Sequence, residues 1–189
     1  MRQDAPLSLI TPELTGWRMS GPGGFRKLDD GSIESFGGSG ILWYADATFR
    51  DFVLEIDWRI TQPEDNSGVF VRIPPLDADI QPAIERGYEI QIDDRGIDPE
   101  TNAAGSPLHL TGAIYKLAPA VRQLSHPVGQ WNEFRITAGR GAIVVELNGV
   151  AVSRLDEPAR EREGHIGLQN HHAGSRVQFR NLYVTPLDE

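Results

Sequence analysis

The sequence predicts an all-β protein, folded as a β-sandwich of two antiparallel sheets. The chain has 20 glycines and 13 prolines among 189 residues, a density that suits short strands and turns. Ten or more short segments have strand character, and no segment has convincing helical periodicity. Two apolar runs flank Asn148-Gly149, and this pair favours a hairpin because it supplies the positive φ angles of a type I′ turn.

The expected strands follow one another along the chain, each bounded by turn residues. They are 17–19, 25–28, 32–36, 41–44, 52–60, 66–72, 87–93, 112–117, 131–136, 143–147, 150–152, 164–169 and 177–184. Residues 45–50 are expected to form a short helical turn. The stretches 73–86 and 94–110 are expected to be long irregular loops, which in a compact domain are often functional.

Strict alternation of apolar and polar residues predicts which side chains are buried. It is clearest over 52–60, because side chains of a strand point alternately to its two faces. The residues predicted to be buried are Leu54, Ile56, Trp58, Ile90, Ile92, Ile166 and Leu168.

Length and charge restrict the organisation and the partners. The length predicts one sandwich domain over 1–189, with 1–13 as an extended N-terminal arm. The absence of cysteine excludes a thiol nucleophile, disulfides and a cysteine-bound zinc. A net charge of −9 without a basic cluster argues against nucleic acid and suits a neutral small molecule such as a sugar.

No apolar run approaches the roughly 20 residues that span a bilayer, and no signal-peptide pattern precedes residue 7. The sequence therefore predicts no membrane partner and favours a cytoplasmic location, and it leaves the oligomeric state open.

The strands 66–72 and 87–93 carry the main candidate site. Glu89, Gln91 and Asp93 alternate with apolar residues, so they are expected to project from one face of a sheet. Phe70 and Arg72 are expected to project from the same face of the neighbouring strand. The arginine would compensate the acids, which favours ligand binding over the alternative that Glu89 and Asp93 are solvated surface carboxylates.

Other segments supply further candidates. Glu55 lies on the polar face of 52–60, and Gln169 faces outward from 164–169. His171 follows Gln169 at strand spacing, so it is the preferred histidine for a base or a metal ligand. Lys116 is a candidate to bind a sugar oxygen or an enolate, with a solvated edge lysine as the alternative. A divalent metal ion is a candidate cofactor, although the sequence has no compact metal-ligand spacing.

The ordered motifs resemble the 3-keto-disaccharide hydrolase family over nearly the whole chain, 15–187. They are DFVLE at 51–55, NSGVFVR at 66–72, GYEIQID at 87–93, TGAIY at 111–115, WN at 131–132, LNG at 147–149, GHIGLQ at 164–169 and FRN at 179–181. The resemblance implies a concanavalin A-like lectin/glucanase jelly roll. One departure is that the family pattern usually has an aspartate where this chain has Asn170.

The resemblance also implies an activity, the cleavage of glycosides that carry a ketone at C3. A base removes the acidified C2 proton, the oxygen on C1 leaves by elimination, and water then adds. In this interpretation Glu89 and His171 are the catalytic candidates. The substrate-binding candidates are Glu55, Arg72, Gln91, Asp93, Lys116 and Gln169.

Two other functions compete with this interpretation. A non-catalytic carbohydrate-binding module is the main alternative, because fold alone does not decide function. An ordinary glycosidase needs two carboxylates at a characteristic separation. Glu89 and Asp93 would be about 13 Å apart along one strand, which is wide for this chemistry. A pair of Glu89 with Glu55 from another strand stays open.

Overall fold

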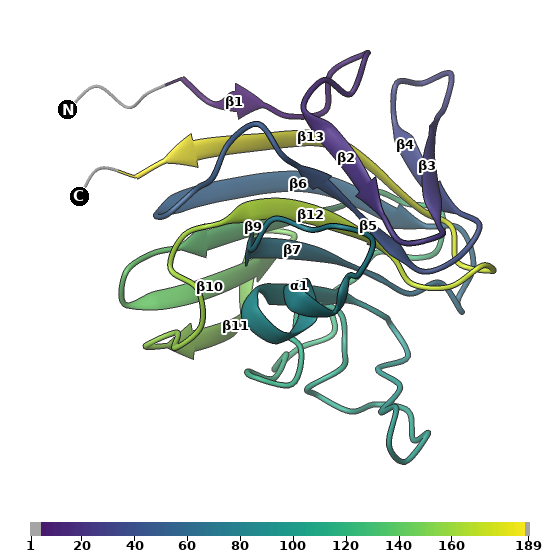
Figure 1. The fold of residues 1–189 in the computed structure, drawn as a ribbon. Coiled ribbons are helices and arrows are strands. Elements are labelled where there is room, and N and C mark those ends of the chain that lie inside the picture. The colour runs from purple at the N-terminus through teal and green to yellow at the C-terminus, as the bar shows by residue number, and fades with distance from the viewer. Residues whose placement is uncertain (1–4, 188–189) are drawn as a thin grey trace.

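The computed structural model describes residues 5–187, which form thirteen strands and one short helix (Figure 1). The strands build an eight-stranded and a five-stranded sheet, both antiparallel, that pack face to face. This arrangement confirms the predicted all-β sandwich.

The larger sheet has the order β11-β10-β9-β6-β13-β4-β3, and β1 pairs with β13. Its strands are β1 (Leu7–Ser8), β3 (Gly24–Lys27), β4 (Ile33–Phe36), β6 (Phe52–Ile60), β9 (Asn132–Ala138), β10 (Ala142–Leu147), β11 (Val150–Asp156) and β13 (Val177–Pro186). Asn148 and Gly149 have φ angles of 51° and 79° and join β10 to β11, which confirms the predicted hairpin.

The smaller sheet has the order β2-β5-β12-β7-β8. Its strands are β2 (Trp17–Ser20), β5 (Gly40–Tyr44), β7 (Ser67–Ile73), β8 (Tyr88–Ile92) and β12 (His165–Asn170). The chain crosses between the sheets several times, for example from β5 to β6 to β7 and from β11 to β12 to β13, so the core forms from residues far apart in sequence.

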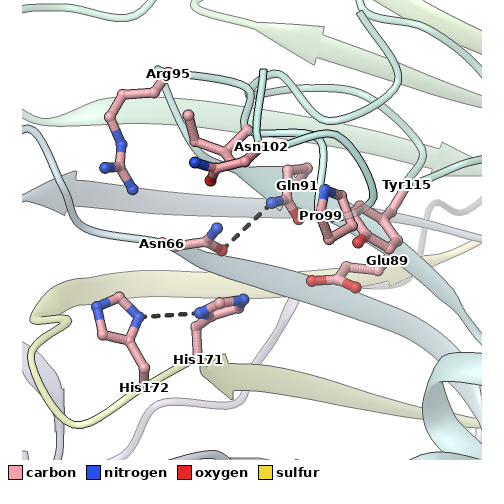
Figure 2. A pocket seen from close by; sticks show the side chains of 10 residues that line it. Asn66, Glu89, Gln91, Arg95, Pro99, Asn102, Tyr115, His171 and His172 are labelled. Carbon is pink, nitrogen blue, oxygen red and sulfur yellow. Dashed lines mark hydrogen bonds between the residues drawn. The ribbon is translucent and has the colours of Figure 1, made fainter. Parts of the chain in front are cut away.

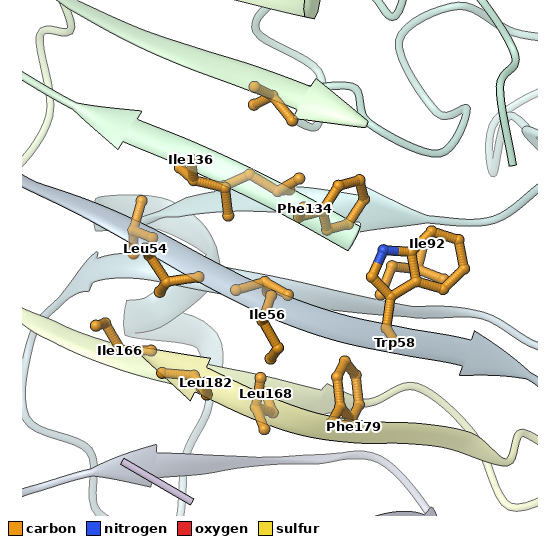
Figure 3. Packing of buried hydrophobic residues seen from close by; sticks show 14 of the residues in the cluster. Leu54, Ile56, Trp58, Ile92, Phe134, Ile136, Ile166, Leu168, Phe179 and Leu182 are labelled. Carbon is orange, nitrogen blue, oxygen red and sulfur yellow. The ribbon is translucent and has the colours of Figure 1, made fainter. Parts of the chain in front are cut away.

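The space between the sheets is filled by the residues that alternation predicted (Figure 3). All seven predicted core residues are buried. Trp58 is fully buried and its ring packs on Phe134, with 5.2 Å between ring centroids. The alternation in β6, β8 and β12 therefore assigned the inner faces correctly.

The outer face of the smaller sheet is partly covered by α1 (Gln81–Arg86). Ala83 of this helix packs with Ile41, Trp43 and Phe70 in a second apolar cluster. The prediction of an irregular loop over 73–86 missed this helix, because six residues are too few to show a helical period. Outward-facing residues of β8 and the end of β12 line pockets on this face.

Two other local predictions differ from the structure. Residues 45–50 form no helical turn, since Phe49 instead bridges Gly164. Residues 112–117 form a turn rather than a strand, and Ile114 makes isolated bridges to Ile90 and to Ala118. Within the predicted arm, Leu7 and Ser8 pair with β13, while residues 1–4 lie outside the described part. The domain boundaries stay a prediction. No helix within residues 5–187 is long and apolar enough to cross a membrane.

Candidate functional site

Two pockets open beside the outward-facing side chains of β8. The first has a volume of about 400 Å³ and is lined by Asn66, Glu89, Gln91, Arg95, Ile97, Pro99, Asn102, Tyr115, His171 and His172 (Figure 2). The second has a volume of about 360 Å³ and is lined by Ser39, Ile80, Ile84, Glu89, Tyr115, Lys116, Arg160, Gln169, Asn170 and His171. Glu89, Tyr115 and His171 line both pockets, so they mark the boundary between them.

The strand pattern of β8 places Glu89 at this boundary. Tyr88 and Ile90 point into the core, so Glu89 and Gln91 point outward. Gly68 on β7 provides the room for the acid, because a Cβ at Gly68 would lie 2.5 Å from Glu89 Oε1. The carboxyl group therefore lies against the backbone of β7.

Burial changes the ionisation of Glu89. Its residue surface is only 7% exposed. This burial raises the pKa of Glu89 to about 8, and a hydrogen bond from Gln169 acts in the opposite direction. Glu89 is thus mainly protonated at neutral pH, and after losing the proton it is a stronger base than an ordinary carboxylate.

The segment 94–118, named here the pocket loop, forms one side of both pockets. Its end is tied to β8 by hydrogen bonds of 2.9 Å from the Tyr115 backbone N–H to the Glu89 carbonyl and from the Gly112 N–H to the Gln91 carbonyl. The Tyr115 ring contacts His109 edge-on at 5.1 Å. Burial and then the nearby Glu89 charge raise the pKa of Tyr115, so its hydroxyl keeps its proton.

His171 and His172 form the rim on the β12 side (Figure 2). Both are exposed, and their Nδ1 atoms are 3.0 Å apart. Desolvation by the surrounding pocket, followed by the charge of His172, lowers the pKa of His171. His171 is therefore neutral at neutral pH, as a base or a metal ligand must be.

Asp93 does not line either pocket, contrary to the prediction. Its side chain is fully buried and accepts hydrogen bonds from the backbone N–H groups of Arg95 at 3.0 Å and Ile97 at 3.1 Å. It also accepts one from Asn66 Nδ2 at 3.3 Å. Asp93 therefore holds the start of the pocket loop and orients Asn66.

Arg72 is also outside the predicted site. A β-bulge places Val71 and Arg72 opposite the single residue Ile166, and Arg72 has a φ angle of 54°. The bulge breaks the alternation, so the guanidinium is fully buried and donates to the carbonyl oxygens of Arg50 and Ala138 at 2.6–3.0 Å. The prediction of a shared face with Glu89 was wrong because a bulge is not visible in a period-two pattern.

Glu55 lies in the other sheet, on β6, and pairs there with Arg135. It lines neither pocket beside β8. The sequence showed that Glu55 is on a polar face, but it did not show which sheet carries that face.

Gln91 lines the first pocket, and Gln169 and Lys116 line the second, while their role in substrate binding stays a prediction. The sequence interpretation missed Asn66, Tyr115 and Asn170. Asn66 precedes β7 in the NSG motif, and Tyr115 stood in a segment expected to be a strand. The Nδ2 group of Asn170 donates to the carbonyl oxygens of Phe36 and Gly24, a role that the acceptor-only aspartate of the family pattern does not share.

The next feature is the arrangement of side chains that could bind a divalent metal ion. Within residues 5–187 no group of three or more histidine, aspartate or glutamate side chains is arranged to hold a metal ion. A metal requirement stays a prediction, and the chemistry proposed below uses side chains of this chain.

Comparisons with known proteins identify the fold and the family of this chain. A protein from Bacillus subtilis with a galectin-like fold superposes with a TM-score of 0.62 at 13% identity, covering 97% of both chains. This likeness confirms the jelly-roll fold. A protein from Parabacteroides distasonis, provisionally assigned as a glycosyl hydrolase, superposes with a TM-score of 0.78 at 25% identity, over 97% of this chain and 100% of that one.

Residues 11–185 match the family described as 3-keto-alpha-glucoside-1,2-lyase-like domain, and the chain belongs to this family. A 3-keto-disaccharide hydrolase from Bacteroides thetaiotaomicron is 27% identical over 90% of this chain and 68% of its own length. These findings confirm the predicted family and the predicted class, a carbohydrate-active enzyme.

Proposed function

We propose that the protein cleaves glycosides of 3-keto sugars, with Glu89 as the base that removes the C2 proton. One observation carries the proposal. Among the described residues that line the two pockets, Glu89 is the only acid, and it stands between the pockets. A disaccharide that occupies both pockets would bring its linkage beside this single carboxyl group.

The chemistry follows from the ketone. A carbonyl at C3 acidifies the hydrogen on C2, and a carboxylate within reach takes it as a proton. The electron pair moves into an enolate, and the C1–O bond then breaks, so that the leaving oxygen takes up a proton and departs. Addition of water to the resulting unsaturated ketone, with a proton returned to C2, completes a net hydrolysis.

The surroundings of Glu89 suit this step. A general base is most effective when its pKa is near the working pH, and burial raises the pKa of Glu89 to about 8. The enolate oxygen needs hydrogen-bond donors, and the Tyr115 hydroxyl and the Lys116 ammonium line the same space. His171 is the alternative base, since it lines both pockets and is neutral.

An ordinary glycosidase receives less support. That mechanism uses two carboxyl groups on opposite sides of the linkage. Asp93 and Glu55, the two partners that the sequence offered, lie outside both pockets. A single acid instead suits an elimination, which needs one base and donors for the enolate.

The test compares turnover of a 3-keto disaccharide with turnover of its unoxidised parent. The proposal expects cleavage of the keto sugar alone, and a loss of at least about 100-fold in Glu89→Gln. Glu55→Gln is the matched control, because it removes an acid of the opposite sheet and should leave turnover unchanged. Equal cleavage of both sugars would contradict the proposal, and saturable binding without any turnover would make the protein a binding module.

A further inference from the structure

Three amide oxygens of residues that line the pockets have no hydrogen-bond partner within residues 5–187. They are Gln91 Oε1, Gln169 Oε1 and Asn170 Oδ1, and all three side chains are buried, with exposures of 3%, 8% and 0%. Gln91 lines the first pocket, and Gln169 and Asn170 line the second. Buried polar atoms are nearly always paired, so three orphan oxygens in one site point to a missing partner.

The orientation of Gln91 follows from its neighbours (Figure 2). The Asp93 carboxylate is an acceptor, so it takes the Nδ2 group of Asn66 at 3.3 Å. Asn66 therefore turns its Oδ1 towards Gln91, which donates its Nε2 at 3.3 Å. The chain of hydrogen bonds leaves Gln91 Oε1 as the free end, and that end is an acceptor.

The other two amide oxygens belong to the second pocket. Asn170 uses its Nδ2 group on two backbone carbonyl oxygens, of Phe36 and Gly24, which only accept. Gln169 lines the second pocket together with Glu89, and its Oε1 atom is buried without a partner among residues 5–187. For Gln91 and Asn170 an acceptor holds the NH₂ group, so the oxygen remains for a ligand.

We propose that these three oxygens bind hydroxyl groups of the sugar, each by accepting a hydrogen bond from one hydroxyl. The inference rests on the proposed function, in which the ligand is a sugar. It divides the site into a strand side that accepts, formed by Gln91, Gln169 and Asn170, and the pocket loop, where Tyr115 and Lys116 donate. A ketone oxygen only accepts, so the C3 ketone must face the pocket loop.

Fluorinated sugars test this assignment, because fluorine replaces a hydroxyl in size but donates no hydrogen bond. The probes are methyl 3-keto-α-glucoside and its 4-deoxy, 6-deoxy, 4-fluoro and 6-fluoro analogues. Their dissociation constants are measured by ligand-observed NMR titration in the Glu89→Gln protein, so that turnover does not consume them. We expect at least one fluoro analogue to bind about tenfold more weakly than the parent, and as weakly as its deoxy counterpart.

Two variants test whether the weaker binding of a fluoro analogue is due to Gln91 Oε1 or to Gln169 Oε1. Gln91→Met and Gln169→Met keep the side-chain length and remove the acceptor, and each should weaken binding of the parent sugar about tenfold. One analogue lacks the hydroxyl that the replaced glutamine would have bound. This analogue should bind the Met variant as tightly as it binds the protein in which both glutamines are intact. Gln130→Met is the control, because Gln130 is exposed in the turn before β9 and should change nothing. Asn170 is left intact because its amide ties β12 to β3 and β4.

The inference is overturned if the fluoro analogues bind as tightly as the parent, or if the Met variants behave as the control does. Absence of saturable binding by the parent overturns it as well. Turnover of the same keto sugar by the unmodified protein is measured separately. Binding with the expected pattern but without turnover would reject only the proposed function, whereas turnover with equal affinity for fluoro analogues would reject only this inference.

Discussion

Glu89→Gln should stabilise the protein while it removes activity, and the gain should depend on pH. Burial raises the folded-state pKa of Glu89 from 4.5 to about 8. Between these values the folded protein retains a proton that the unfolded chain has already released. The folded state therefore loses stability as pH rises through this window. A neutral glutamine of the same shape does not ionise and avoids this loss.

The size of the effect follows from the shift. Each pKa unit corresponds to about 1.4 kcal/mol, and the interval from 4.5 to pH 7 covers about 2.5 units. Glu89→Gln should thus be more stable than the parent by about 3 kcal/mol at pH 7, and by almost nothing near pH 4. Urea unfolding followed by tryptophan fluorescence, repeated between about pH 4 and pH 8, measures this difference.

Glu55→Gln is the control for this experiment too, because Glu55 is part of an exposed ion pair with Arg135 and should show little pH-dependent gain. A stability difference for Glu89→Gln that stays constant across the pH range would refute the reasoning, since it would mean that Glu89 titrates alike in the folded and unfolded states.

Three further predictions concern the core, the space that Gly68 leaves for the Glu89 carboxyl group, and the identity of the base. Trp58→Ala should cost about 3–5 kcal/mol in urea unfolding, and parent-like stability would contradict its burial against Phe134. Gly68→Ala should lower turnover at least tenfold by displacing the Glu89 carboxyl group, whereas Gly141→Ala, where a Cβ meets nothing within 4 Å, should be silent. The rate should rise with pH to a midpoint near 8 if Glu89 is the base, and a midpoint below 6.5 would instead indicate His171.

Much of the fold could be predicted because alternation reports burial directly. Leu54, Ile56 and Trp58 lie on the inner face as their spacing indicated, and Glu89 and Gln91 lie on the outer one. A strand's own sequence contains this information, since each side chain needs only to point to one side or the other.

The placement of Arg72 and Glu55 could not be predicted for two different physical reasons. Arg72 lies in a bulge that depends on how β7 pairs with β12, so the direction of its side chain is decided by a neighbouring strand. The sheet to which Glu55 belongs depends on long-range pairing of β6 with β9 and β13. The pockets also depend on the pocket loop, whose course is set by contacts such as the hydrogen bonds of Asp93 to backbone N–H groups.

The fate of the C2 hydrogen tests the central proposal most directly. Elimination by Glu89 removes this hydrogen as a proton, whereas displacement at C1 leaves it in place. Cleavage in heavy water, corrected for exchange of the ketone without enzyme, should therefore place deuterium at C2 of the keto-sugar product. Cleavage that keeps the original hydrogen at C2 would contradict the elimination mechanism.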